Sequence, residues 1–372
     1  MSASHYKRRL EPLLAAAGVR LDGPEPWDLE VHDPRFYRRV LAHGSMGLGE
    51  SYMEGWWDAE DLDGLLFRLL KADLDEQDHT WDLKLTVLRA RLLNLQARGR
   101  AFIVGRRHYD LDDSLYKAML GKRLVYSCGY WQEADTLDAA QEAKLELVFK
   151  KLGLKPGMRV LDIGCGWGEA LKLAAERHGV SGVGITVSEN QAAYARELCR
   201  GLPVEIKMMD YRELHESYDR IFSIGMFEHV GEKNYRIYME LARRCLKEDG
   251  LFLLHCIGSN ISTHITDPWI QKYIFPNGML PSIQQIGEAV ERLFVMEDWH
   301  NFGAHYDRTL MAWRRNVEQH WQELRGRFDA VFYRMWRYYL SASAGSFRAR
   351  KSQLWQVVLS PHGVPGGYVS PR

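Results

Sequence analysis

Three glycines in the middle of the chain, Gly164, Gly166 and Gly168, directly follow an apolar run in the stretch VLDIGCGWG. Such a run predicts a short buried strand. Glycines placed between a strand and a helix let backbone N–H groups approach an anionic ligand closely. The loop therefore holds a dinucleotide, holds another adenosyl cofactor, or is a tight turn with no ligand.

The spacing favours a cofactor other than a dinucleotide. The nicotinamide fingerprint is G-x-G-x-x-G with an acidic residue at the end of the following strand. Here the glycines are spaced G-x-G-x-G, Asp162 lies two residues before the first, and the next predicted strand ends in GITVS, without a carboxylate. The form D-x-G-x-G-x-G resembles the first motif of class I S-adenosylmethionine methyltransferases. We therefore expect S-adenosylmethionine at this loop.

Strands and helices alternate from about residue 137 onward, which predicts an α/β fold with a doubly wound, Rossmann-like parallel sheet. A final strand in LWQVVLSP would pair antiparallel at an edge of the sheet or inside it. The expected strands are Val160–Ile163, Gly182–Val187, Val204–Met208, Arg220–Gly225 and Leu251–Cys256, and the expected helices are Gly168–His178, Glu189–Arg200 and Asn234–Leu246.

The length of 372 residues predicts more than one domain. We expect a smaller mixed or helical N-terminal domain over residues 1–105, a linker over 106–120 and a catalytic domain over 121–372. In the first of these, Leu62, Leu65, Leu66 and Leu69 recur at the spacing of one helix face.

Composition excludes several classes of protein. Lys+Arg and Asp+Glu both number 49, so no overall charge favours nucleic-acid binding. The five cysteines contain no C-x-x-C pair, which argues against a zinc site or a disulfide framework and favours a reducing cytoplasm. No apolar run is long enough to span a bilayer, and the first residues lack the apolar core of a signal peptide.

Local charge is uneven. The stretch Leu83–Tyr109 contains seven Lys and Arg residues and no acidic one. After Asp329 the chain has no carboxylate side chain, but it carries Arg334, Arg337, Arg348, Arg350 and Lys351. These residues form a solvated helix face or connector, pack against another part of the protein, or lie on anionic lipid headgroups.

Several motifs together are specific for one family. VYSCGYW, LDIGCGWG, GITVSENQ, FEHVG, HYDRTLMAW and FRARKSQLWQVV resemble the cyclopropane fatty acyl phospholipid synthases, and GLGESYMEGWWDAEDLDGLL extends the resemblance to the N-terminal part. Mycolic-acid methyltransferases share several of these motifs but usually lack such an N-terminal domain. The resemblance implies a seven-stranded methyltransferase sheet.

The same resemblance implies the reaction. A methylene group passes from S-adenosylmethionine to the cis double bond of an unsaturated acyl chain in a membrane phospholipid, through a carbocation that loses a proton before the ring closes. The resemblance implies that the base is a bound bicarbonate ion. Its implied ligands are Cys128, Glu228, His255, the backbone at Ile257, and Tyr306.

The resemblance also implies where the cofactor lies. Tyr126 and Ser127 would contact its methionine part, and the glycine loop its carboxylate. Thr186, Ser188 and Gln191 would take the role that an acidic residue has toward the ribose in many relatives, and Asp210 with Tyr211 would flank the adenine. The full set of expected cofactor residues is Tyr126, Ser127, Asp162, Gly164, Cys165, Gly166, Trp167, Gly168, Thr186, Ser188, Gln191, Asp210 and Tyr211.

One position departs from the family pattern. Many relatives carry a cysteine where this chain has Ser343, and no His or Lys adjacent in sequence would activate a serine there. We therefore expect no nucleophile at this position. The alternatives are a methyltransferase that acts on an acyl chain or an amine without closing a ring, and a lipid-binding protein without activity. We further expect a homodimer, bound peripherally at the cytoplasmic face of a phospholipid bilayer.

Overall fold

The computed structural model describes residues 2–263 without 73–112, and residues 265–372. The described residues form two compact units. Residues 2–72, 265–276 and 306–352 are called the helical unit, and residues 113–263, 277–305 and 353–372 the sheet unit. The basic stretch Leu83–Tyr109 and the expected boundary at residue 105 lie outside the described residues. Residues 113–120 of the expected linker form helix α6.

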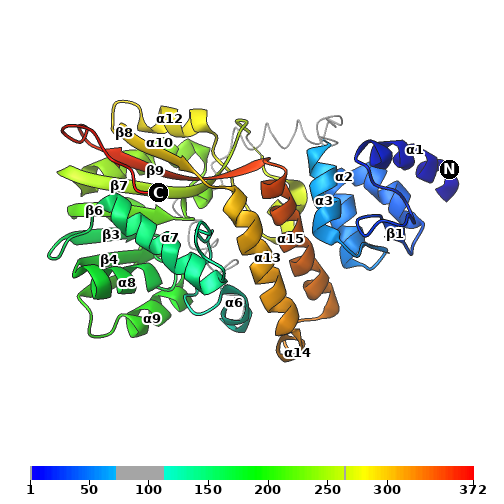
Figure 1. Cartoon of the computed structure of the whole chain (residues 1–372), viewed down its shortest axis with the longest axis horizontal. Coiled ribbons are helices and arrows are strands. Elements are labelled where there is room, and N and C mark those ends of the chain that lie inside the picture. Colours follow the sequence, from blue (N-terminus) through cyan, green and yellow to red (C-terminus); the bar gives the residue numbers. More distant parts are fainter. Residues whose placement is uncertain (1, 73–112, 264) are drawn as a thin grey trace. The chain divides into compact units, whose positions relative to one another are not determined.

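The sheet unit contains a seven-stranded sheet with the strand order β5-β4-β3-β6-β7-β9-β8 (Figure 1). Neighbours from β5 to β7 are parallel, and β8 pairs antiparallel with β9. The predicted doubly wound sheet is confirmed. Its strands are β3 (Arg159–Ile163), β4 (Ser181–Thr186), β5 (Val204–Met208), β6 (Tyr218–Ile224), β7 (Leu246–Ser259), β8 (Val295–Asn301) and β9 (Ser352–Ser360).

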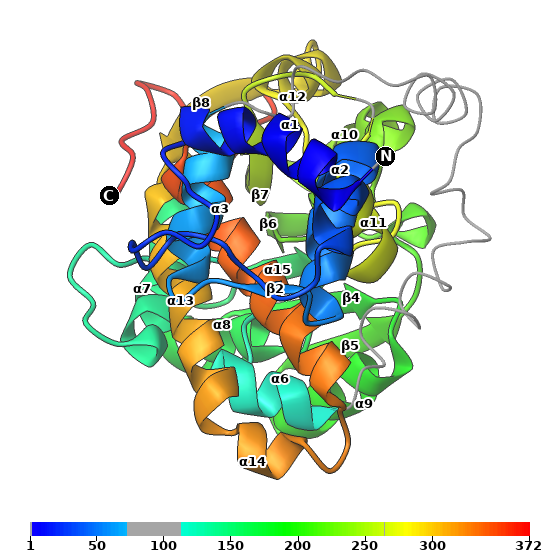
Figure 2. The ribbon, with the colours of Figure 1, turned by 90° about the vertical axis from the view of Figure 1, so that its right-hand side faces the viewer.

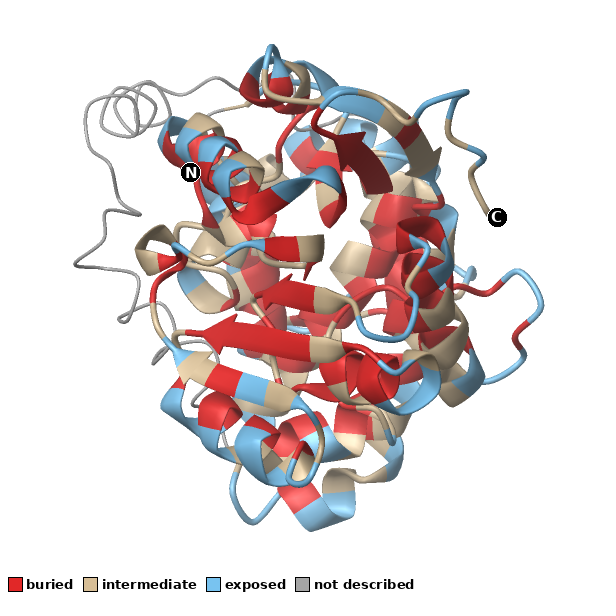
Figure 3. Ribbon diagram, turned by 90° about the vertical axis from the view of Figure 1, so that its left-hand side faces the viewer, coloured by how far each residue is buried: buried red, intermediate tan, exposed pale blue. Residues whose placement is uncertain are grey.

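Two apolar cores cover the two faces of this sheet. On one face, Leu145 and Phe149 of α7 and Leu171 of α8 pack against Val160 and Leu253. On the other face, side chains of α10 and α12 pack against the alternate residues of the same strands. Figure 3 shows that the strands between these layers are largely buried. The helices of the unit are α6 (Asp113–Leu120), α7 (Leu137–Leu152), α8 (Glu169–His178), α9 (Glu189–Leu198), α10 (Glu232–Cys245) and α12 (Ile283–Val290).

The last two strands complete the sheet. β9 is the strand expected in LWQVVLSP, and it lies inside the sheet, between β7 and β8. β8 was not predicted. Its sequence, VMEDWHN, does not alternate between apolar and polar residues, which is the pattern by which a strand is recognised. Its one buried residue is Asp298.

The helical unit is built around α3 and α15, which contact each other closely (Figure 2). Gly345 of α15 allows this approach, because a Cβ there would lie 2.8 Å from the backbone nitrogen of Phe67. Leu62, Leu65 and Leu66 are buried as expected, whereas Leu69 is half-buried. The elements of the unit are α1 (Ala3–Ala16), β1 (Glu30–Val31), α2 (Arg35–Met53), β2 (Trp57–Asp58), α3 (Leu62–Lys71), α11 (Pro268–Tyr273), α13 (Ala304–Gln319, whose first two residues belong to the sheet unit), α14 (Trp321–Leu324) and α15 (Ala330–Arg348).

Three of the arginines that follow Asp329 are paired inside the helical unit. Arg334 contacts Asp58 at 2.8 Å, and Arg337 contacts Glu318 at 3.2 Å. Arg348 contacts Asp63 and Asp307, both at 2.8 Å. These contacts favour a structural role for the three guanidinium groups over one at a lipid surface. Among the described residues, no helix is long and apolar enough to cross a membrane.

Gly258 provides a test of the β7–β9 packing. A Cβ at this buried position would lie 2.0 Å from the ring of Trp355, so we expect Gly258→Ala to cost about 1–3 kcal/mol through displacement of the indole. Gly287→Ala in α12 is the matched control, because a Cβ there meets nothing within 4 Å and alanine favours a helix by about 1 kcal/mol. Thermal unfolding should show a lower Tm for the first variant only. Equal Tm values for the two variants would contradict the packing.

Candidate active site

The glycine loop adopts backbone conformations that favour glycine. Gly164, Gly166 and Gly168 have φ values of 89°, 51° and 88°. A Cβ at Gly164 would lie 2.8 Å from Met226, and one at Gly168 would lie 2.9 Å from Ala195, whereas Gly166 faces open space. The first and third glycines therefore permit close packing, and Gly166 is where a ligand can approach the backbone.

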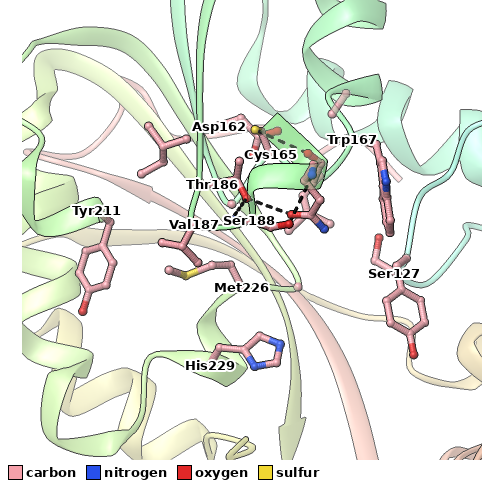
Figure 4. A pocket seen from close by; sticks show the side chains of 18 of the residues that line it. Ser127, Asp162, Cys165, Trp167, Thr186, Val187, Ser188, Tyr211, Met226 and His229 are labelled. Carbon is pink, nitrogen blue, oxygen red and sulfur yellow. Dashed lines mark hydrogen bonds between the residues drawn. The ribbon is translucent and has the colours of Figure 1, made fainter. Parts of the chain in front are cut away.

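The loop borders a cavity of about 190 Å³ within the sheet unit. Figure 4 shows Trp167 and Ser127 on one side of it and Tyr211 on the other. Twelve of the thirteen expected cofactor residues line the cavity. The exception is Gly168, which caps the N-terminus of α8. The twelve are Tyr126, Ser127, Asp162, Gly164, Cys165, Gly166, Trp167, Thr186, Ser188, Gln191, Asp210 and Tyr211.

A hydrogen-bond network fixes the wall that follows β4. The hydroxyl of Thr186 donates to Oε1 of Gln191 at 2.9 Å, and the backbone N–H of Ser188 donates to the Thr186 hydroxyl at 3.2 Å (Figure 4). The Ser188 hydroxyl accepts from the N–H of Gln191 and so caps α9. The wall thus offers neutral polar groups to a ligand where a nicotinamide site would offer a carboxylate.

The wall that follows β5 contains an arginine that the sequence did not indicate. Arg212 donates to Asp210 from its backbone N–H and from its guanidinium, both at 2.9 Å, and the guanidinium lies 4.6 Å from the ring centre of Tyr211. Asp210 is 1% exposed. The arginine neutralises this buried carboxylate, so the pair presents little net charge to the cavity.

A third wall, which contains Ser127, is held by a lysine that the sequence did not indicate. Lys144 of α7 is fully buried, and its Nζ donates to the hydroxyl of Ser127 at 2.8 Å. Asp162 is 2% exposed. Burial raises the pKa of Asp162 and lowers that of Lys144, and the attraction between the two groups opposes both shifts. Lys144 escaped notice because nothing in the sequence of α7 marks which of its lysines is buried.

Three of the expected anion ligands of the sheet unit, Glu228, His255 and Ile257, lie around the ends of β6 and β7. Glu228 accepts from the backbone N–H of Ile257 at 2.6 Å, so this N–H is already engaged. His255 lies in β7, is 1% exposed, and has its Nδ1 3.3 Å from the amide nitrogen of Gln356. Cys128 is fully buried, and its thiol donates to the carbonyl of Gly129 at 3.2 Å.

Two buried atoms among these groups have no hydrogen-bond partner within the described part of the chain. They are Oε2 of Glu228 and Nε2 of His255. Burial raises the pKa of Glu228 to about 7 and lowers that of His255. Both groups are therefore biased toward their neutral forms, which is unusual for a carboxyl group and typical of functional sites.

Comparison with known proteins identifies the family. A family model described as mycolic acid cyclopropane synthetase matches residues 96–357. Cyclopropane-fatty-acyl-phospholipid synthase of Escherichia coli K12 is 51% identical over 364 residues, which cover 98% of this chain and 95% of the relative. This chain belongs to the mycolic acid cyclopropane synthetase family. The predicted family resemblance is confirmed.

Other members of the family extend the comparison. Tuberculostearic acid methyltransferase of Mycobacterium tuberculosis H37Rv is 31% identical over 98% of this chain and 90% of its own length. A solved structure of the mycolic acid cyclopropane synthase CmaA1, in complex with S-adenosylhomocysteine (SAH) and CTAB, has a TM-score of 0.66 at 32% identity. It covers 69% of this chain and 97% of the other. The fold is thus that of the S-adenosylmethionine-dependent methyltransferases.

Two residues singled out from the sequence lie in the helical unit. Tyr306 is buried there, with its ring 5.9 Å from that of Trp313 and 4.6 Å from that of Phe347. Ser343 is half-buried in α15. The family model spans both residues, but the role of Tyr306 at an anion and the inertness of Ser343 stay predictions.

The raised pKa of Glu228 predicts a pH-dependent stability. A carboxyl group whose pKa rises from 4.5 in the unfolded chain to about 7 in the fold stabilises the fold below pH 4.5, and it loses this contribution as the pH rises through 7. Glu228→Gln keeps the acceptor for Ile257 but does not titrate. We therefore expect the Tm of the variant minus that of the wild type to increase between pH 5 and pH 8. A constant difference across this range would show that the carboxyl titrates normally.

Proposed function

We propose that this protein is a cyclopropane-fatty-acyl-phospholipid synthase. It transfers a methylene group from S-adenosylmethionine to the cis double bond of an unsaturated acyl chain in a membrane phospholipid. The observation that carries this proposal is the 51% identity, over 98% of the chain, with the Escherichia coli enzyme of that name.

The cavity of the sheet unit suits S-adenosylmethionine. Gly166 gives a ligand access to the backbone, and the Thr186–Gln191 network offers hydroxyl and amide groups to a ribose. Aromatic rings gather on the side of Trp167, where Tyr116 lies 5.2 Å from Trp167 and 5.6 Å from Tyr126. Ring faces attract a cationic centre such as a sulfonium. The relative CmaA1 has been solved with SAH, which supports this use of the fold.

The groups near β7 fit a small protic anion such as bicarbonate. With the amide nitrogen of Gln356 donating to Nδ1 of His255, the proton of the neutral ring lies on Nε2, which is then a donor. Oε2 of Glu228 is a donor when protonated and an acceptor when ionised. The two unpartnered atoms can therefore satisfy an oxyanion that also carries a proton. When bound, bicarbonate would supply the base for the proton that leaves the new methyl group.

Glu228, His255 and the buried walls of the cavity would hold the proton, donate a hydrogen bond and exclude water. Glu228 is held by the N–H of Ile257, so its second oxygen has a fixed direction in which to hold or share a proton. The low pKa of buried His255 keeps its ring neutral, so it donates a hydrogen bond without adding a positive charge beside a developing carbocation. The buried walls exclude water, which would otherwise capture that cation.

A second candidate function is methylation of an acyl chain without ring closure. The 31% identity with tuberculostearic acid methyltransferase over 98% of the chain supports it. The two reactions share the attack of the alkene on the methyl group and differ in which proton is lost afterwards. The products therefore distinguish them.

The proposed reaction predicts a defined product. Vesicles of unsaturated phospholipid incubated with the protein and S-adenosylmethionine should gain one CH₂ per modified chain, and proton NMR should show ring protons at high field. Glu228→Ala should lower turnover by a factor on the order of 100 with unchanged SAH affinity, as expected for loss of a group that handles a proton. Branched or exomethylene chains would favour the second function, and an absence of any lipid product would contradict both.

We also propose that the protein binds membranes peripherally, at the cytoplasmic face, as a homodimer. The basic stretch Leu83–Tyr109 supports this proposal, because each basic residue near an anionic leaflet contributes about 1 kcal/mol. Charge reversal at Arg91, Arg98 and Arg100 should weaken co-sedimentation with anionic vesicles and reduce its salt dependence. The control is the same reversal at the exposed residues Lys150, Lys155 and Arg200 of the sheet unit, so that the two triple variants have the same net charge. Equal binding by the two triple variants would refute a role for this stretch, and light scattering reports the dimer.

A further inference from the structure

We propose that Lys144 is a positioning residue that holds the Tyr126–Cys128 segment in place and thereby sets the affinity for the cofactor. This inference rests on the proposed use of the cavity by S-adenosylmethionine. It concerns a residue of α7 that is fully buried and does not itself line the cavity.

The Tyr126–Cys128 segment is attached to α7 by hydrogen bonds. Residues 127–130 lie outside the named strands, and hydrogen bonds with α7 hold them. Gln141, also fully buried, donates from its side-chain amide to the carbonyl of Ser127 at 2.8 Å, and Lys144 donates to the Ser127 hydroxyl at 2.8 Å. The N–H of Tyr130 donates to the carbonyl of Ala140 at 2.8 Å. Gly129 permits this contact, because a Cβ there would lie 2.9 Å from that of Ala140.

The segment carries residues of the cofactor cavity and an expected anion ligand. Tyr126 and Ser127 line the cofactor cavity, and Cys128 is the adjacent expected anion ligand. The only side-chain hydrogen bond of Lys144 among the described residues is the one to Ser127. The lysine therefore fixes the rotamer of a hydroxyl in the cavity wall, between the cofactor groups on one side and Cys128 on the other.

Burial of the Lys144 amine costs free energy of desolvation. A buried amine is not required for packing, since an apolar side chain of similar length would fill the same space at no cost in desolvation. Asp162 partly compensates the charge, and one of its own oxygens is buried without a hydrogen bond. A buried lysine bonded to a residue of the cavity wall is therefore better explained by a role at the cavity than by packing.

Lys151 offers a matched control. It lies two turns further along the same helix, is also buried, and donates to Asp298 at 2.9 Å. Asp298 is additionally held by Arg372 and Ser370. Lys151 does not line the cavity, and its partners belong to β8 and the C-terminal residues. The same substitution at the two positions therefore separates loss of a buried lysine from loss of the bond to Ser127.

The experiment measures SAH binding by calorimetry and Tm by calorimetric scanning, on the full-length chain. Lys144→Met should weaken SAH binding on the order of tenfold, the loss expected for one hydrogen bond from a charged donor, with a Tm close to that of the wild type. The KM for S-adenosylmethionine should rise, whereas the KM for lipid should not. Lys151→Met should leave SAH affinity unchanged and lower the Tm.

A double-mutant cycle tests whether Lys144 acts through Ser127. Ser127→Ala should weaken SAH binding in the wild type and add little in the Lys144→Met background. If Lys144→Met proves unstable, Gln141→Met, which removes the other bond to Ser127, should still weaken SAH binding. Wild-type affinity in both α7 variants, or equal losses in Lys144→Met and Lys151→Met, would overturn this inference alone. A wild-type chain that does not bind SAH would overturn the proposed function as well.

Discussion

The parallel pairing of β3 with β4 on one side and β6 on the other is the constraint on which the site depends. The chain leaves β3 toward β4 and β5 and later returns to β6 and β7, so the strand order reverses beside β3. At such a switch point the loops after two neighbouring strands diverge and leave a crevice. The glycine loop after β3 and Met226 after β6 line that crevice, and the walls after β4 and β5 extend it. The register of four strands thus assembles residues from four separate parts of the sequence.

This constraint explains what could be predicted from the sequence. Asp162, Thr186 and Asp210 each lie within two residues of the end of a strand that the sequence predicts, and parallel strands bring their carboxyl ends to one edge of the sheet, so their meeting follows from the pattern. The roles given to Tyr126, Ser127 and Cys128 came from the family resemblance. None of these residues lies in a named strand, and bonds from α7 to Ser127 together with the ring contact of Tyr126 with Tyr116 of α6 hold them at the cavity.

The residues that were missed share a physical reason. Lys144 and Gln141 lie on a helix with three lysines, and the sequence does not show which of its faces meets the segment 127–130. Arg212 follows two expected residues directly, but its pairing with Asp210 depends on a turn of the backbone. β8 has the composition of a polar connector, and it becomes a strand because β9 offers it a buried partner. In each case tertiary contact outweighs the local pattern.

Two carboxyl groups at opposite ends of the sheet, Asp219 and Glu228, have pKa values shifted in opposite directions. At the amino ends of the strands, Asp219 is partly buried, which raises its pKa, but bonds from Lys247 and from the N–H of Arg159 outweigh this and hold it below the usual value. At the carboxyl ends, Glu228 has no salt bridge within the described part of the chain, and its pKa rises to about 7, while burial lowers that of His229 to about 4. Pairing at one end stabilises the ionised carboxylate that a folded surface tolerates. Desolvation at the other end biases Glu228 and His229 toward their neutral forms. The proposed reaction, which creates a carbocation and then removes one proton, would use this second environment, because groups that are neutral near physiological pH exchange protons at little cost.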